Sequence, residues 1–222
     1  MGGGEEVPRE SRPGRRSIRL KGYDYAQAGA YFVTLCTQGR SFLFGEIAAH
    51  EMQANEAGAM VIEEWHALPM RYPGVHLDAF VLMPNHIHAV LFLAPEEAVG
   101  AGLVPAPLSQ PNRSATPDAG ATTRVAPVTL GDVIGAFKSI TTVRYARGVE
   151  TRGWPAFSQR LWQRNYYEHI VRDDESLQQI REYIAENPAC WDLDGENPRA
   201  KTSASRDEPW RSRLPFSPRE RT

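Results

Sequence analysis

The two histidines at positions 86 and 88 are the residues whose type and spacing point most directly to chemistry. They flank Ile87 and open the apolar run 89–93, which is typical of a buried strand. Side chains two positions apart on a strand point to the same face, so the imidazoles of His86 and His88 would lie side by side, about 6–7 Å apart. Such a pair can bind one divalent ion. The alternative is a structural pair whose ring nitrogens find hydrogen-bond partners inside the core.

Tyr183 and Asn187 form a second pair, four residues apart on a helix predicted to run from position 173 or 174 to about 187. The acidic start suits the positive end of a helix, and Pro188 stops it. At this spacing the phenol and the carboxamide share one face of the helix. The phenol could then act as a nucleophile, and the amide oxygen could bind the ion held by the histidines. Amide and imidazole ligands with open water positions suit Mg²⁺ or Mn²⁺ better than a closed zinc site. The alternatives are core packing for the tyrosine and a simple helix stop for the asparagine.

The elements that must position these residues follow from the hydrophobic pattern. We predict strands at 30–37, 75–82, 86–93 and 161–171, and helices at about 53–68, from 129 to before a loop at 148–160, and at 173–187. A loop or short strand is expected at 41–50. This order predicts an α+β, ferredoxin-like fold, in which one antiparallel sheet carries two helices on one face and the last helix carries the tyrosine. The first and third strands should be central neighbours.

Length and composition indicate one domain with extended ends. The chain has 222 residues, of which 41% are hydrophobic, and a formal net charge of −2. We expect a disordered, Arg-rich leader at 1–17, a folded domain at 18–191 with a flexible insertion at about 94–127, and a Pro- and Arg-rich disordered tail at 192–222. Clustered arginines in such ends are typical of phosphate-binding arms, although they also keep disordered ends soluble.

Cysteine usage and the N-terminal sequence suggest a cytoplasmic protein. Cys36 and Cys190 are the only cysteines, so the chain lacks a disulfide framework or a four-cysteine metal site. The first residues lack the apolar run of a signal peptide, and no apolar stretch approaches the length needed to span a bilayer.

Six segments, read together and in order, resemble the REP-associated tyrosine transposases. These are relatives of the single-tyrosine transposases of the HUH (His-hydrophobe-His) superfamily. The segments are Gly22–Tyr25, Gly29–Thr37, Val81–His88, Gly135–Ser139, Leu161–Gln163 and Tyr183–Pro188. The resemblance covers about residues 18–191, and the chain departs from the compact family pattern in its long insertion and its long tail.

The resemblance implies a role for each of the paired residues. His86 and His88 match the metal-binding histidines, Tyr183 matches the nucleophile, and Asn187 matches the polar residue that completes the metal site, which would hold Mg²⁺ or Mn²⁺. The implied activity is transesterification on hairpin-bearing single-stranded DNA through a 5′-phosphotyrosine intermediate, in DNA transposition or in processing of REP elements. A nucleoid-associated location follows, and a homodimer is compatible, since the tyrosine helix in this superfamily acts in its own subunit or in a partner's.

Further residues are candidates for DNA contact. They are Arg15, Arg16, Arg19, Lys138, Trp162 and Tyr167. The arginines and aromatic residues would bind a hairpin stem and stack unpaired bases, and Lys138 would lie near the phosphate. Core packing is the alternative for the aromatic residues, and a solvated helix face is the alternative for the lysine.

Three rival interpretations remain open at this point. A ferredoxin-like sheet also describes non-catalytic nucleic-acid-binding modules, although the aromatic strand motif of the RNA-recognition domains is absent here. The enzyme could instead be a domesticated nickase acting on repeated palindromes. A structural zinc protein is disfavoured, because no cysteines join the two histidines.

Overall fold

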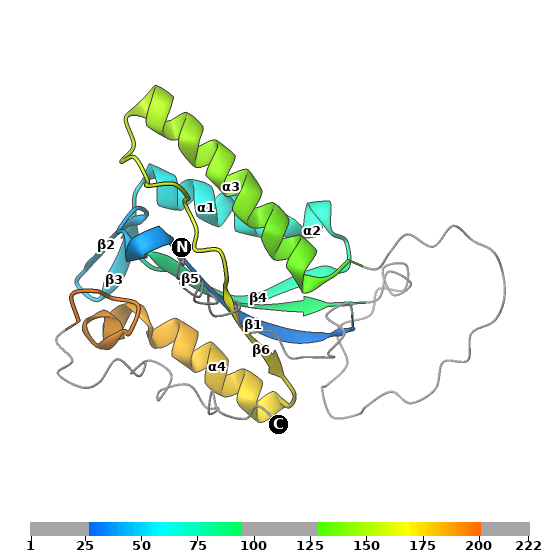
Figure 1. The fold of residues 1–222 in the computed structure, drawn as a ribbon. Coiled ribbons are helices and arrows are strands. Elements are labelled where there is room, and N and C mark those ends of the chain that lie inside the picture. Colours follow the sequence, from blue (N-terminus) through cyan, green and yellow to red (C-terminus); the bar gives the residue numbers. More distant parts are fainter. Residues whose placement is uncertain (1–26, 95–127, 201–222) are drawn as a thin grey trace, which may run out of the picture.

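The computed structural model describes residues 27–94 and 128–200. Its centre is a four-stranded antiparallel sheet in the order β4-β5-β1-β6. The strands are β1 (Gly29–Cys36), β4 (Val75–Leu82), β5 (His86–Leu93) and β6 (Tyr167–Val171). Helices α1 (Glu56–His66) and α3 (Leu130–Arg152) cover one face of this sheet, and α4 (Asp174–Glu186) covers the other (Figure 1). The smaller elements are the hairpin β2 (Gly45–Ala48) and β3 (Glu51–Ala54), helix α2 (Leu68–Arg71), and the 3₁₀ turns Gln38–Arg40 and Pro188–Leu193.

The predicted ferredoxin-like α+β arrangement is confirmed. The first and third long strands, β1 and β5, pair along their whole length, from Gly29 opposite Leu93 to Cys36 opposite His86. Both strands are apolar on most positions of both faces, and a strand of this kind is stable only at the centre of a sheet that is covered on both sides.

Three element boundaries differ from the sequence prediction. The chain forms the β2–β3 hairpin before α1, and α1 begins only after Asn55, whose side-chain oxygen accepts a hydrogen bond from the Gly58 backbone N–H. Helix α3 continues through part of the predicted loop to Arg152, and it ends where Gly153 adopts a left-handed conformation with φ of 69°. The fourth strand is limited to β6, because residues 161–166 run mostly as irregular backbone.

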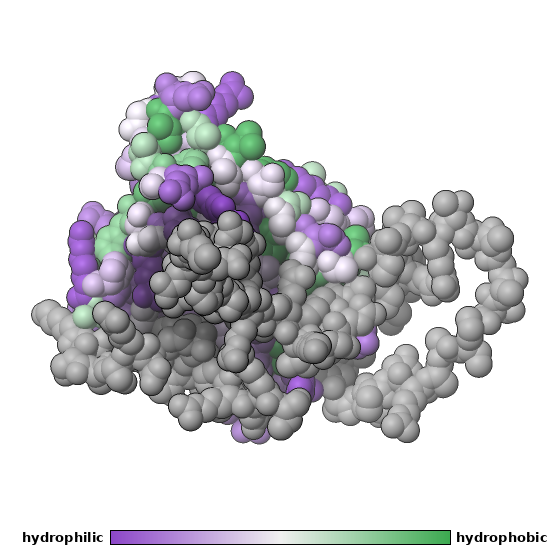
Figure 2. All heavy atoms as spheres, viewed as in Figure 1, coloured by the Kyte–Doolittle hydropathy of each residue, from purple (hydrophilic) through white to green (hydrophobic). Residues whose placement is uncertain are grey.

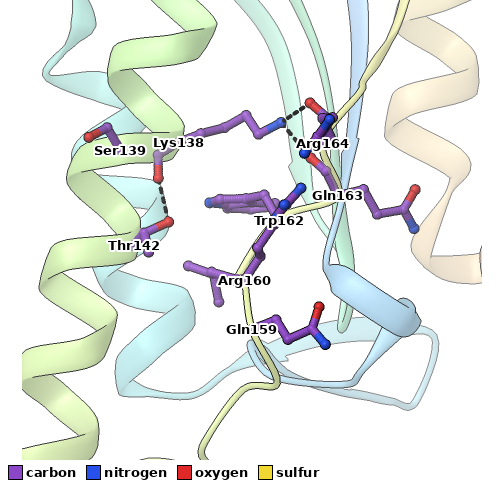
Figure 3. A pocket seen from close by; sticks show the side chains of 9 residues that line it. Lys138, Ser139, Thr142, Gln159, Arg160, Trp162, Gln163 and Arg164 are labelled. Atoms are coloured by element: carbon purple, nitrogen blue, oxygen red, sulfur yellow. Dashed lines mark hydrogen bonds between the residues drawn. The ribbon is translucent and has the colours of Figure 1, made fainter. Parts of the chain in front are cut away.

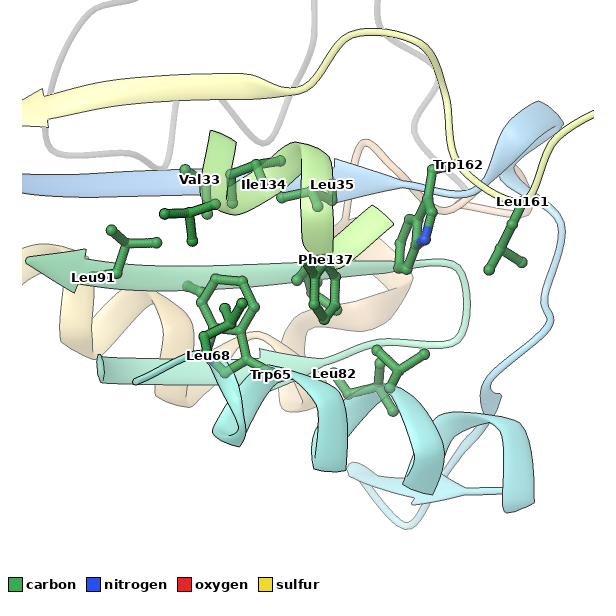
Figure 4. Close-up of a cluster of buried hydrophobic side chains, with 14 of the residues drawn as sticks. Val33, Leu35, Trp65, Leu68, Leu82, Leu91, Ile134, Phe137, Leu161 and Trp162 are labelled. Atoms are coloured by element: carbon green, nitrogen blue, oxygen red, sulfur yellow. The ribbon is translucent and has the colours of Figure 1, made fainter. Parts of the chain in front are cut away.

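The main core lies between the sheet and the pair α1 and α3 (Figure 4). Its largest fully buried side chain is Trp65 of α1. The indole stacks on Phe80 at a centroid distance of 5.5 Å and meets Phe137 of α3 edge-on at 5.3 Å. The two contacts of this one indole thus join β4 to both helices.

The opposite face carries a smaller apolar cluster under α4. Leu177, Ile180 and Ile184 form the buried stripe that helical spacing predicts, and they pack against Phe32 and Val90 of the sheet. Asp173 caps the helix through a hydrogen bond of 2.7 Å from the Ser176 backbone N–H. This stripe fixes which face of α4 meets the sheet.

The chain beyond α4 does not leave the domain where the predicted tail begins. Residues 192–200 remain folded, and the buried side chains of Asp194, Glu196 and Asn197 hold them against the end of the sheet. The predicted leader 1–17, nearly all of the insertion and the tail from residue 201 lie outside the described residues.

The part of the surface that Figure 2 colours mixes polar and apolar side chains along α3. Val143 on this helix is 68% exposed. Scattered exposed apolar residues of this kind are normal for a folded domain. Among the residues that the structure describes, no helix combines the length and apolar character required to cross a membrane.

Candidate active site

The two histidines lie side by side at the start of β5, as their spacing predicts, but their ring centroids are 4.5 Å apart, closer than the expected separation of about 6–7 Å. The Nε2 atoms of His86 and His88 are 3.1 Å apart, and both side chains are completely buried. Ile87 between them points into the main core. The pair therefore occupies the α4 face of the sheet at its centre, where the backbone is held by neighbouring strands on both sides.

Asn85 orients the first imidazole. Its Nδ2 donates hydrogen bonds to the backbone oxygens of Glu196 at 2.7 Å and Arg40 at 3.2 Å. Its Oδ1 is thereby left to accept the Nδ1–H of His86 at 2.8 Å. The proton on Nδ1 leaves the Nε2 lone pair of His86 facing the site, which is the arrangement found in metal-ligating histidines.

Thr34 performs the corresponding task for the second imidazole. It is the cross-strand neighbour of His88 on β1, and its hydroxyl oxygen lies 2.7 Å from His88 Nδ1. Phe32, two residues earlier on the same strand, stacks on the His88 ring at a centroid distance of 5.6 Å. Both contacts direct Nε2 of His88 toward the same point as Nε2 of His86.

Burial keeps both imidazoles neutral. Desolvation lowers the pKa of His86 to about 3, with a smaller effect from the charge of Arg40. Burial also lowers the pKa of His88 well below its ordinary value, with a further contribution from His86. Neutral imidazole is the form that binds a metal ion, so the pair is ready for ligation at neutral pH.

Tyr183 reaches this site from α4. Its hydroxyl lies 3.2 Å from Nε2 of His88, and the side chain is 7% exposed. Arg181, two residues earlier, forms a two-point ion pair with Asp78 of β4, with Nε and Oδ1 2.8 Å apart. A β-bulge between Leu77 and Phe80 lies at the Asp78 position. The ion pair thus anchors the tyrosine helix to the edge strand of its own sheet.

Two buried oxygens near the end of α4 lack hydrogen-bond partners: Asn187 Oδ1 and Asp194 Oδ2. The Asp194 oxygen lies 3.6 Å from His86 Nε2, while its other oxygen accepts the Glu196 backbone N–H at 2.6 Å. Ligating atoms of His86, His88 and Asp194 all fall within 4.8 Å of one another. An orphaned carboxylate oxygen beside two imidazole lone pairs is costly unless a cation is present, so the donor set fits a divalent metal ion.

Sequence reasoning missed Asp194, because it lies in residues assigned to the tail. No periodicity marks this segment, and the contact with His86 joins positions distant in the chain. The sequence offers one weak signal, the close succession of polar residues Asp194, Glu196 and Asn197 directly after the helix region. Only the folded chain shows that the first of these reaches the histidines.

The segment that carries Asp194 is fastened to the end of β1. Glu196 Oε2 accepts hydrogen bonds from Arg40 Nε at 2.7 Å and from the Cys36 thiol at 3.2 Å. Burial raises the pKa of that thiol well above its usual range, which keeps it a donor. Trp191 lies between the rings of His86 and Phe42, at centroid distances of 6.0 and 5.6 Å. These contacts place the carboxylate beside the histidines.

Of the predicted DNA-contacting residues that the structure describes, Tyr167 lies beside this site, and Lys138 and Trp162 do not. Lys138 lies on α3, across the sheet from Tyr183, and donates to the backbone oxygens of Gln163 and Arg164. Trp162 is buried among core aromatic residues, and its indole N–H donates to Thr141, so the core-packing alternative describes it. Tyr167 faces the α4 side, where it is the strand partner of Thr34 and contacts Phe32 edge-on. Arg15, Arg16 and Arg19 lie outside the described residues.

Fold and site together define an α+β domain in which a helix-borne tyrosine meets a buried His-His-Asp cluster. An uncharacterized protein of Haemophilus influenzae is 38% identical over 180 residues, which make up 81% of this chain and 91% of that protein. The chain therefore belongs to the same family as the Haemophilus influenzae protein. No family model matches the chain.

Two solved structures are similar in chain path. One is a REP-associated tyrosine transposase bound to a REP hairpin, with 16% identity and a TM-score of 0.44, covering 75% of this chain and 70% of that chain. The other is a protein from Deinococcus radiodurans, with 18% identity and a TM-score of 0.37, covering 75% of this chain and 95% of that chain.

Proposed function

We propose that the protein is a metal-dependent transposase or nickase that cleaves and rejoins single-stranded DNA through a phosphotyrosine intermediate. The observation that carries this proposal is the hydroxyl of Tyr183, 3.2 Å from His88 Nε2 and beside the His86–Asp194 pair. A phenol held against a metal-binding cluster suits nucleophilic attack on a phosphodiester. The DNA substrate and its hairpins rest on the motif resemblance.

The proposed ligands for Mg²⁺ or Mn²⁺ are the clustered His86, His88 and Asp194, together with Asn187, which the motif resemblance adds and whose Oδ1 is buried without a partner. Among these two ions, the pair of imidazoles favours Mn²⁺, because Mg²⁺ prefers oxygen ligands. When bound, the ion supplies positive charge that polarises the scissile phosphate and favours the phenolate. Asn85 and Thr34 would keep both Nε2 lone pairs aimed at it.

In the cleavage step Tyr183 supplies the attacking oxygen. Its phenol loses a proton to solvent, the oxygen forms a bond to phosphorus, and the bond from phosphorus to the 3′-oxygen breaks. The departing 3′-oxygen takes up a proton, which leaves a 5′-phosphotyrosine and a free 3′-hydroxyl. The reverse step with another 3′-hydroxyl rejoins the strand, so rejoining needs no external energy source.

One chain contributes every residue of this centre. Tyr183 contacts His88 of its own sheet, and only Arg172 and Asp173 connect β6 to α4. We therefore propose that the tyrosine acts in its own subunit, whether or not the protein forms a homodimer. Its work would be DNA transposition or processing of REP elements, beside the nucleoid in the cytoplasm.

A denaturing gel tests the proposal. Wild type, Tyr183→Phe and the matched control Tyr167→Phe are incubated with labelled hairpin-bearing single-stranded DNA and Mn²⁺, Mg²⁺ or EDTA. We expect a metal-dependent covalent adduct with wild type and Tyr167→Phe, and none with Tyr183→Phe. An adduct that persists in Tyr183→Phe would refute the assigned nucleophile. DNA retention without any adduct would favour a non-catalytic nucleic-acid-binding module.

A further inference from the structure

A pocket of about 300 Å³ opens between α3 and the segment 159–164, on the sheet face opposite Tyr183 (Figure 3). Its lining residues are Lys138, Ser139, Thr142, Gln159, Arg160, Leu161, Trp162, Gln163 and Arg164. Three of them are cations and none is a carboxylate. A concave surface with this charge favours an anionic ligand.

Lys138 is the half-buried part of this charge. Figure 3 shows its side chain extending from α3 to the backbone of Gln163 and Arg164, whose oxygens lie 2.6 and 3.0 Å from Nζ. Burial lowers its pKa to about 8, and no carboxylate contributes to the shift. The amine therefore holds the pocket wall in place and adds a positive charge that no acidic side chain neutralises among residues 27–94 and 128–200.

Arg160 and Arg164 supply the solvent-accessible part of the positive charge of the pocket. Both are exposed, and neither takes part in an ion pair within the described ranges 27–94 and 128–200. A guanidinium group carries several donors in a planar fork that matches phosphate oxygens. Gln159 and Ser139 add polar groups at the same wall, which suit the edge of a base.

The segment that forms the pocket wall is hydrogen-bonded to the end of β1, next to the candidate active site. Trp162 pairs with Thr37, and the Gln163 backbone N–H donates to the Cys36 oxygen at 2.9 Å. Cys36 is in turn the strand partner of His86. A single strand that leaves the site around this end of the sheet would meet the pocket directly.

We infer that the pocket binds one phosphate-bearing nucleotide of the single strand next to the cleaved bond. Arg160 and Arg164 hold the phosphate, and Lys138 positions the wall that carries them. The inference rests on the proposed function for the identity of the strand. The volume matches the lower end of small-ligand sites, which suits one nucleotide rather than a duplex.

The binding test uses full-length Tyr183→Phe protein, so that the DNA stays intact. Fluorescence anisotropy with a labelled hairpin bearing unpaired flanks is measured against salt concentration. Adding Arg160→Gln and Arg164→Gln should weaken binding at least tenfold and reduce the salt slope by about 0.7, since the two arginines share one phosphate and one lost single-strand phosphate contact removes about 0.7. The control pair Arg147→Gln and Arg172→Gln removes two exposed arginines elsewhere and should change the slope less. Equal effects of both pairs would overturn the inference.

A second measurement locates the phosphate. Neutral methylphosphonate links replace the phosphates of the flank one at a time. We expect one position near the cleavage site at which neutralisation weakens binding to the protein with both pocket arginines, but not to the Arg160→Gln, Arg164→Gln protein. Absence of such a position would contradict the pocket assignment.

Adduct formation separates this inference from the proposed function. On an otherwise wild-type background, the pocket variants should still form the Tyr183 adduct at saturating DNA. If the pocket variants form the adduct and bind DNA as tightly as the parent protein, the pocket assignment is wrong and the proposed nuclease activity stands. If the pocket variants bind DNA more weakly but wild type forms no adduct, the proposed nuclease activity is wrong and the pocket assignment stands.

Discussion

The two faces of the sheet are built from the same strands but have different roles. On β1, Tyr31, Val33 and Leu35 face α1 and α3, whereas Phe32 and Thr34 face α4. The first face is a mainly apolar core, in which the indole N–H of Trp65 is buried without a hydrogen-bond partner. The second pairs a small apolar cluster with buried imidazoles and two oxygens that lack hydrogen-bond partners.

This difference shows how one sheet combines stability with a reactive site. The apolar face gains from every buried side chain, so a substitution there should act on folding. Around the histidines, burial disfavours charge and leaves Asn187 and Asp194 each with an unpaired oxygen. Substitutions there should act on metal binding and chemistry, and some should stabilise the metal-free protein. The predictions below test this division.

Trp65→Ala should give the largest loss of stability. The substitution removes the aromatic contact between β4, α1 and α3 and leaves a cavity, at a cost of about 3–5 kcal/mol. The free energy of unfolding is measured by urea denaturation. Trp65→Phe is the matched control: it keeps a ring in place and removes an indole N–H that has no partner. A cost below about 1 kcal/mol for the alanine variant would contradict the central place of this residue in the core.

Asp194→Asn should separate stability from metal binding. The new amide can donate to His86 Nε2 while its oxygen keeps the Glu196 contact, so the metal-free protein should gain about 1 kcal/mol. Calorimetric titration with Mn²⁺ should show at least tenfold weaker binding than in wild type. The exposed Asp192→Asn serves as the control and should change neither quantity. Unchanged Mn²⁺ affinity in Asp194→Asn would remove this carboxylate from the ligand set.

Metal-free protein should lose stability as the pH falls below about 6.5. Unfolded histidine takes up a proton near this pH. The folded state keeps His86 neutral down to about pH 3, and burial likewise keeps His88 neutral. Protonation of each histidine in the unfolded state therefore lowers the free energy of unfolding by up to about 1.4 kcal/mol per pH unit. Urea denaturation in EDTA between about pH 7 and pH 5 measures the slope. His86→Gln should reduce it by about one histidine's share, unlike the exposed control His76→Gln.

Asp78→Asn should have the smallest effect on stability and a selective effect on the reaction. Loss of the partly exposed ion pair with Arg181 costs about 0.5–1 kcal/mol. Because the pair anchors α4, the rate of adduct formation should fall severalfold, and Asp78→Glu should restore part of it. Glu63→Gln breaks an exposed contact with Arg144 on the opposite face and should leave the rate unchanged. Equal rates in both variants would show that the Asp78 pair does not position Tyr183.

Local sequence determined much of this protein. Alternation and apolar content predicted the strands that became β1, β4 and β5, and helical spacing predicted the buried stripe of α4. The same two periods placed His86 beside His88 and set Tyr183 on the helix face with Ile180. These features depend on neighbours within a few residues, which is why they can be predicted without the fold.

Only the tertiary structure decided how the pieces meet. The α4 face that carries Tyr183 came to lie on the histidines because β6 and the Asp78–Arg181 pair direct the helix across the sheet. Asp194 entered the site because Asn85 and Glu196 fold the following segment back onto β1. Lys138 was separated from the site because α3 packs on the other face. Contacts between residues far apart in the chain leave no period in the sequence, so they follow from packing alone.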